Sequence, residues 1–215
     1  MSLTPTLSGL AVPASVNVLL LPGWMNSDAA HWQSRWEALY GWCRVEQNDW
    51  DWPRRGDWMA RLDEVVQASA GPIVLVAHSL GVHLVAAWAA HSQHTARVHA
   101  AMLVAPPDTD RDDLAPNLFS WRSRARQRLP FPSLVVCSSD DPYCGSTSCA
   151  VMAADWGSSC VSIGAHGHIN GASGLGDWPQ GLDLLRTLGA SDDAATDSAT
   201  DSATDSATDI ATDNA

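Results

Sequence analysis

The chain has 215 residues and a net charge of −12, with eleven tryptophans, five cysteines and no lysine among its twelve basic residues. This length allows one domain, or one domain with a tail, and the negative charge argues against sequence-independent binding of nucleic acids, which depends on neutralising phosphates. The apolar run at residues 16–21 is far too short to span a bilayer, and residues 1–15 contain neither Lys nor Arg, so we expect no secretory signal and no membrane association.

The two ends of the chain differ from its body. We expect an N-terminal extension over residues 1–15, one domain over 16–189 and a tail over 190–215. The tail repeats Asp-Ser-Ala-Thr and carries seven aspartates, which supply more than half of the net negative charge. It has almost nothing to bury and cannot offset the entropy of ordering, so the sequence predicts a disordered, solvating tail.

Within the body, short apolar runs alternate with helical patterns. We expect strands at residues 16–21, 44–47, 73–77, 98–104, 133–137 and 161–163. We expect helices at residues 29–42, 57–70, 80–92, 145–156 and 180–188, with Asp57 as an N-cap. Strands that are mostly continuous rather than alternating in hydrophobicity are typical of a parallel sheet covered on both faces. The predicted fold class is therefore α/β, with a doubly wound, mostly parallel sheet.

Residues 106–131 form the one long stretch without clear periodicity, and they leave no room for a large cap domain. Four arginines alternate in this stretch, and we expect a solvated loop rather than an anion site. The arginines are Arg122, Arg124, Arg126 and Arg128.

Ser79 is the candidate nucleophile. It follows the apolar strand that ends at His78, and an apolar helix is expected to begin directly after it. This is the setting of a nucleophile elbow, a sharp turn that projects the hydroxyl out of the sheet. Gly81 supplies the small residue required where the strand and helix backbones nearly touch. We expect His78 to be a packed or hydrogen-bonded neighbour, since adjacent side chains at a strand end point to opposite faces.

Two backbone amides are the candidate oxyanion-hole donors. The amide of Leu80 lies at the start of the helix, beside the serine hydroxyl. The loop after the first strand should supply the second donor, and the amide of Trp24, which follows Gly23, is the natural one. The Pro22-Gly23 pair is equally consistent with an ordinary turn.

A serine hydroxyl needs a base that a carboxylate orients, in the chain order Ser, Asp or Glu, His. The strand at 133–137 leads into Asp140 and Asp141, and we choose Asp141 because the following proline holds it in an extended geometry. We expect Asp140 to bracket the turn.

The base should lie in the loop after the last strand, where two histidines flank a glycine. We choose His168 because Gly167 lets the loop bring its imidazole over the serine, and we expect His166 to be a supporting residue. The pair also suggests a metal, but no third ligand stands at a usual spacing, so no metal is expected. His83, His91, His94 and His99 are interpreted as helix-face or surface residues.

The cysteines are odd in number and form no Cys-x-x-Cys pair, which predicts free thiols in a reducing, cytoplasmic compartment. Cys144 and Cys149 are five residues apart, a poor spacing for a shared metal on one helix. We expect all five to behave as small buried hydrophobes. Among the tryptophans, Trp32 and Trp36 share a helix face and are expected to pack in the core. Whether Trp24, Trp50 or Trp52 lines an acyl pocket stays open.

Longer motifs extend through the body: Leu21-Pro22-Gly23-Trp24, His31-Trp32-Gln33, His78-Ser79-Leu80-Gly81, Asp140-Asp141-Pro142-Tyr143-Cys144, Gly167-His168-Ile169-Asn170 and Trp178-Pro179. With these motifs the chain resembles the small serine hydrolases grouped with the retinoblastoma-binding serine hydrolase and its bacterial relatives. The resemblance covers roughly residues 16–188. It implies an α/β-hydrolase fold with little or no cap and a triad on Ser79, Asp141 and His168. It implies no particular substrate.

The sequence thus predicts a cofactor-free serine hydrolase that acts on a small ester, thioester or amide. The expected partner is a small acyl substrate, with no nucleic acid, no membrane and no obligate protein partner. Two alternatives remain: a non-catalytic binding protein that keeps the hydrolase fold, and an acyltransferase that uses the same triad.

Overall fold

An entirely parallel six-stranded sheet organises residues 16–190, the part of the chain that the computed structural model describes. In spatial order its strands are β2 (Cys43–Arg44), β1 (Asn17–Leu21), β3 (Ile73–His78), β4 (Val98–Val104), β5 (Ser133–Cys137) and β6 (Ser159–Ser162). The strand order reverses once, between β1 and β3, so the crossover from β1 to β2 lies on the opposite face from the crossovers between β2 and β6. This is the predicted doubly wound α/β architecture.

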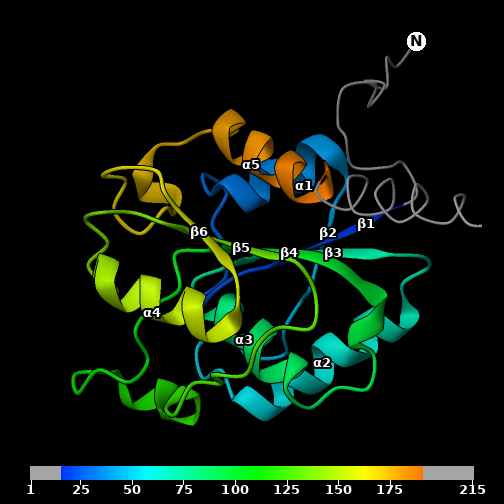
Figure 1. The fold of residues 1–215 in the computed structure, drawn as a ribbon, viewed down its shortest axis with the longest axis horizontal. Helices are drawn as coiled ribbons and strands as arrows, with labels where there is room; N and C mark the ends of the chain where they lie inside the picture. Colours follow the sequence, from blue (N-terminus) through cyan, green and yellow to red (C-terminus); the bar gives the residue numbers. More distant parts are fainter. Residues whose placement is uncertain (1–15, 191–215) are drawn as a thin grey trace, which may run out of the picture.

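Helices cover both faces of the sheet (Figure 1). On one face lie α1 (Trp32–Tyr40) and α5 (Pro179–Ala190), and on the other lie α2 (Arg55–Ala68), α3 (Leu80–Ala89) and α4 (Ser146–Trp156). Short 3-10 helices complete the described elements: η1 (Thr95–Arg97), η2 (Pro116–Trp121) and η3 (Gly171–Ser173). Each strand of β1, β3, β4 and β5 is buried almost throughout, as expected for a sheet with two covered faces.

Tryptophans fill much of the core. Trp32 and Trp36 are fully buried and pack against each other and against Trp178, which confirms their predicted packing role. The indole nitrogen of Trp32 donates to the backbone carbonyl of Ile169 at 2.8 Å, and that of Trp36 donates to the backbone carbonyl of Asp177 at 2.7 Å. These bonds join α1 to the loop that follows His168.

Several predicted boundaries are wrong by a few residues. Helix α1 begins at Trp32, because the Nδ1 atom of His31 accepts from the amide of Gln33 and caps it. Asp57 lies in the first turn of α2 and is not its N-cap, which is Arg54. Strand β2 ends at Arg44, and β6 begins two residues before the expected strand. Pairing with the neighbouring strand decides the limits of β2 and β6, and this pairing cannot be read from the local sequence pattern.

The solvated loop expected for residues 106–131 is confirmed only in part, because Arg126 and Arg128 are exposed but Arg124 is not. The Arg124 side chain is only 8% exposed and bridges Asp110 and Asp155, at 2.6 and 3.0 Å. His83, expected as a helix-face or surface residue, does lie on α3, but it is buried there and bonded to the carbonyl of Pro107 at 2.7 Å. The segment folds over α3 and α4, and the buried guanidinium of Arg124 therefore needs its two carboxylate partners.

No helix within residues 16–190 is long and apolar enough to cross a membrane. The predicted N-terminal extension and nearly all of the predicted acidic tail lie outside the described residues.

Candidate active site

Ser79 occupies a strained turn between β3 and α3. Its φ of 54° and ψ of −124° place it in a region that residues other than glycine rarely adopt. Its amide donates to the carbonyl of Val104 at 2.9 Å, which anchors the turn to β4. Such strain costs about 1–3 kcal/mol and clusters at functional sites.

Two glycines permit the close approach that the turn requires. A Cβ atom on Gly81 would lie 2.3 Å from the carbonyl oxygen of Leu21, and one on Gly23 would lie 2.6 Å from Cβ of Ser79. A side chain at either position would therefore force backbone or nucleophile to move. Trp24, the residue after Gly23, lines the cavity that opens onto Ser79. The amide of Leu80 lies at the first position of α3, which has no side-chain cap.

The structure brings Ser79, His168 and Asp141 together from three separate segments. The Nε2 atom of His168 lies 2.8 Å from Oγ of Ser79. Its Nδ1 atom lies 3.0 and 2.9 Å from the two carboxylate oxygens of Asp141. The His168 side chain is 10% exposed and that of Asp141 is 3% exposed. An imidazole held in this way can accept a proton from the hydroxyl while the carboxylate faces the other nitrogen.

Asp140 and His166 lie beside this contact and do not enter it. One oxygen of Asp140 accepts from the hydroxyl of Ser138 and from the amide of Gly167, both at 2.7 Å. The hydroxyl of Ser138 in turn accepts from the amide of His166 at 2.9 Å. These bonds lower the pKa of Asp140. As the sequence indicated, Asp140 brackets the turn, and it also holds the loop of the adjacent histidines.

Two further histidines lie behind His168. The Nε2 atom of His78 bonds the backbone carbonyl of His168 at 2.9 Å, and the His31 ring packs edge-on against the His78 ring. Burial lowers the pKa of His31 to about 4 and the pKa of His78 well below its usual value. Both imidazoles therefore stay neutral at neutral pH, and neither places a positive charge beside His168. The sequence did not indicate that the His31 ring contacts His78 behind the site, because this contact depends on how α1 packs.

A cavity of about 440 Å³ opens onto Ser79 and His168. Trp24 and Met25 line it, together with apolar residues from the segment before and within η2. Trp50 and Trp52 are not among its described lining residues; Trp50 packs against Trp58, and Trp52 is exposed. Of Trp24, Trp50 and Trp52, only Trp24 is among the described residues that line this cavity.

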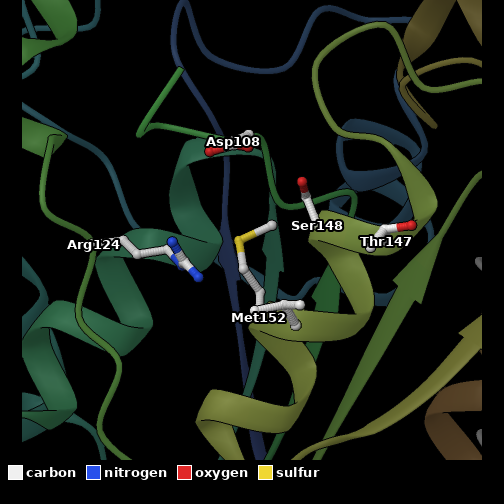
Figure 2. Close-up of a pocket in the computed structure, with 6 residues that line it drawn as sticks. Asp108, Arg124, Thr147, Ser148 and Met152 are labelled. Carbon is white, nitrogen blue, oxygen red and sulfur yellow. The ribbon is translucent and has the colours of Figure 1, made fainter. Parts of the chain in front are cut away.

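A second, smaller cavity of about 130 Å³ lies between the Arg124 segment and α4 (Figure 2). In Figure 2 the side chain of Arg124 extends toward Met152, and Asp108 lies at one side. Because Arg124 is already paired with two carboxylates, this cavity offers no free cation to a ligand. Asp108 lines both cavities.

The histidine pair suggested by the sequence does not form a metal-ligating group among the described residues. Within residues 16–190, the group of side chains with suitable donor spacing is Cys137, Cys149 and Cys160. None of the three lines the cavity at Ser79.

Comparison with known proteins agrees with this geometry. A family model described as serine hydrolase matches residues 18–187. A YdeN-like hydrolase from Pectobacterium atrosepticum is 29% identical, with a TM-score of 0.72 over 81% of this chain and 91% of that chain. The expected kind of family is thereby confirmed, while the link to the retinoblastoma-binding member stays a resemblance. A search of curated protein sequences gave no significant match.

Two more distant structures share the fold. The ydeN gene product of B. subtilis is 18% identical, with a TM-score of 0.62 over 80% of this chain and 97% of that chain. An esterase of a Rhodococcus species is 15% identical, with a TM-score of 0.60 over 83% of this chain and 91% of that chain. At such identities the likeness shows the α/β-hydrolase fold alone.

Proposed function

This chain belongs to the serine hydrolase family, and from that premise we propose that it cleaves a small, neutral ester, thioester or amide through an acyl-enzyme on Ser79. The observation that carries the proposal is the continuous set of contacts from Oγ of Ser79 through the imidazole of His168 to the carboxylate of Asp141. Each partner has the role that acyl transfer requires.

Acylation begins when His168 takes the hydroxyl proton and the oxygen of Ser79 attacks the carbonyl carbon. Asp141 faces the Nδ1 nitrogen, which holds the imidazole in the required tautomer and stabilises the imidazolium that forms. His168 then gives its proton to the leaving group. Water attacks the acyl-enzyme with His168 again acting as the base, and the acid is released.

The amides of Leu80 and Trp24 stabilise the oxyanion in both steps. Support comes from the position of Leu80 at the start of α3, where an amide has no partner within the helix, and from the contact of Gly23 with the serine. The helix dipole of α3 acts in the same direction.

The charges around the cavity favour a neutral substrate. Arg111 is the one arginine among the described lining residues, and it is already paired with Asp113 and bonded to the carbonyl of Pro142. Carboxylates of Asp28, Asp108 and Asp113 also lie at the cavity. A negatively charged acyl group would therefore meet like charge without a free cation.

An apolar acyl chain of modest size suits the same cavity. Met25 and Tyr143 line it and are themselves more than half exposed, at 65% and 51%. Burying such surface against an acyl chain is favourable, at about 25 cal/mol per Å². A volume of about 440 Å³ lies at the small end of the range of about 300–1,000 Å³ for ligand pockets.

The proposal places the enzyme in a reducing, cytoplasmic compartment and requires no cofactor for the reaction. All five cysteines are free, which supports such a compartment because disulfides persist mainly in oxidising ones. It also requires no nucleic acid, membrane or obligate protein partner, since the described residues form a complete site within one chain.

Labelling with a fluorophosphonate probe tests the proposal. We expect one modified residue, Ser79, and no labelling of Ser79→Ala. Ser173→Ala is the matched control, because this serine also lies near the histidine loop, with its hydroxyl bonded to the carbonyl of His166 at 2.6 Å. Labelling that persists in Ser79→Ala would show that the elbow is not the nucleophile.

A panel of neutral acyl esters, assayed with and without an alcohol acceptor, then identifies the reaction. Release of free acid in both conditions supports hydrolysis. Formation of a new ester at the expense of acid would instead indicate acyl transfer, and no turnover of any ester would favour a binding protein.

A further inference from the structure

Four of the five cysteines converge at one place, although they come from separate elements. Cys137 ends β5, Cys160 lies on β6 and Cys149 lies on the first half of α4. Their three sulfur atoms lie within 4.8 Å of one another, and those of Cys137 and Cys160 are 3.9 Å apart. Cys144, in the loop before α4, adds a fourth thiol beside Cys149.

This thiol cluster, Cys137, Cys144, Cys149 and Cys160, is closed on one side and open on the other. Cys137, Cys144 and Cys149 are buried against the apolar core between β5 and α4. Cys160 is exposed, and no disulfide joins any of the four. The cluster therefore has both a dry interior and a path by which a small ion can enter.

We propose that the thiol cluster binds one thiophilic divalent d¹⁰ cation, with Zn²⁺ as the natural occupant, through the sulfurs of Cys137, Cys149 and Cys160. Sulfur-only donors select soft or borderline-soft metals. Four sulfurs at a Zn–S distance of about 2.3 Å stand about 3.8 Å apart in a tetrahedron. The sulfurs of Cys137 and Cys160, 3.9 Å apart, already have this spacing, and the sulfur of Cys149 lies within 4.8 Å of both.

Charge favours a divalent ion over a monovalent one. Three thiolates around a monovalent cation leave two uncompensated negative charges in an apolar surrounding, whereas a divalent cation leaves one. An uncompensated charge is costly in such a place.

Binding exchanges protons for the metal. At each ligating cysteine the S–H bond breaks, the sulfur keeps the electron pair and bonds the metal, and the proton passes to solvent. Burial raises the pKa of Cys160 to about 11, and the thiol contact with Cys144 together with burial raises the pKa of Cys149 further.

The proposed metal site takes no part in acyl transfer, but its cysteines flank the loop that carries Asp141. None of the four cysteines lines the cavity at Ser79. Asp141 stands between Cys137 and Cys144 in the sequence, so a bound ion would join β5, β6 and α4 beneath the loop that holds this carboxylate. Its expected effect is on the stability of that loop, and no step of acyl transfer passes through it.

The test is titration of the full chain with Zn²⁺ against a chromogenic chelator, with a phosphine reductant present. We expect one ion per chain, and Cd²⁺ should give a thiolate-to-metal charge-transfer band. Cys160→Ser should weaken Zn²⁺ binding by more than about 100-fold, since loss of even an outer-shell partner costs about 10–100-fold. Cys43→Ser is the matched control, because Cys43 is exposed and lies on β2, at the opposite edge of the sheet.

Cys160 is the decisive position because it is exposed, so its serine variant is expected to fold even where Cys149→Ser does not. Zn²⁺ should also raise the thermal midpoint of the wild-type chain and of Cys43→Ser, but not that of Cys160→Ser. The proposal is wrong if the reduced wild-type chain takes up no stoichiometric ion, or if Cys160→Ser binds Zn²⁺ as tightly as Cys43→Ser does.

Discussion

Both carboxylate oxygens of Asp141 lie within hydrogen-bonding distance of Nδ1 of His168, at 3.0 and 2.9 Å. The amide of Tyr143 donates to one of these oxygens at 2.9 Å and fixes the carboxylate in place. With the Asp141 side chain only 3% exposed, water scarcely competes for this contact. The imidazole is therefore aimed at Ser79 by a carboxylate that is itself held by its own turn.

Asp141→Asn should lower kcat by about 10⁴-fold, because the amide favours the wrong imidazole tautomer, as in the serine-protease case. Asp140→Asn is the matched control. Its retained carbonyl oxygen can still accept from Ser138 and Gly167, so we expect a loss of less than about 10-fold. Steady-state kinetics on an activated ester measures both variants, and the reverse ranking would contradict the choice of Asp141.

Gly23→Ala should lower kcat/KM at least about 100-fold, since displacing a reacting group by about 1 Å has that effect. The new Cβ atom would lie 2.6 Å from Cβ and 3.0 Å from Oγ of Ser79. Gly56→Ala, on α2 with nothing within 4 Å of the added atom, is the control and should keep full activity. Full activity in Gly23→Ala, with an unchanged thermal midpoint, would show that the close approach does not position the nucleophile.

A general base must be unprotonated to accept the proton of the nucleophile, so the activity should be lost at acid pH. Burial lowers the pKa of His31 to about 4 and that of His78 well below its usual value, so neither adds an ionisation near pH 6.5. A pH profile of kcat/KM should thus show one ionisation on the acid side. His166→Ala should keep it and His168→Ala should abolish most of the rate; the opposite pattern would exchange the two roles.

The folded state should lose stability as the pH falls from about 6.5 to about 4. Burial lowers the pKa of His83 to about 4, so in this window the unfolded chain binds a proton that the folded chain does not. The loss from this one group approaches about 3 kcal/mol by pH 4, at about 1.4 kcal/mol per pKa unit. The full contribution is present above pH 6.5.

Denaturant unfolding at several pH values between 4 and 7 measures this slope. His83→Gln removes the titrating ring and can still donate to the carbonyl of Pro107, so the slope of the free energy of unfolding against pH should decrease. His91→Gln, at an exposed position just after α3, is the control and should leave the slope unchanged. Equal slopes in the wild-type chain and in His83→Gln would contradict the linkage.

Removal of residues 191–215 should leave kcat/KM and the thermal midpoint unchanged. The Asp-Ser-Ala-Thr repeat has almost no apolar side chains to bury against the body. Differential scanning fluorimetry of the shortened and the full chain measures the midpoint. A decrease of several degrees would show that the acidic segment packs on the domain.

The sequence by itself determined the parallel α/β architecture and the places where chemistry-bearing loops begin. Continuous apolar runs identify buried strands, and a serine between such a run and an apolar helix identifies the elbow at Ser79. The order of Ser79, Asp141 and His168 along the chain was also readable. The strands and the elbow are local features that depend on residues close together in the sequence, whereas the triad follows from the chain order that this fold uses.

Only the tertiary structure decided which side chains meet. Arg124 was expected in solvent, yet it bridges Asp110 and Asp155, carboxylates that lie 14 and 31 residues away in the chain. Cys137 and Cys160 have no sequence relationship, and the pairing of β5 with β6 sets their sulfurs 3.9 Å apart. Such contacts depend on strand register and on how loops pack over the sheet. These are long-range properties that local periodicity does not encode.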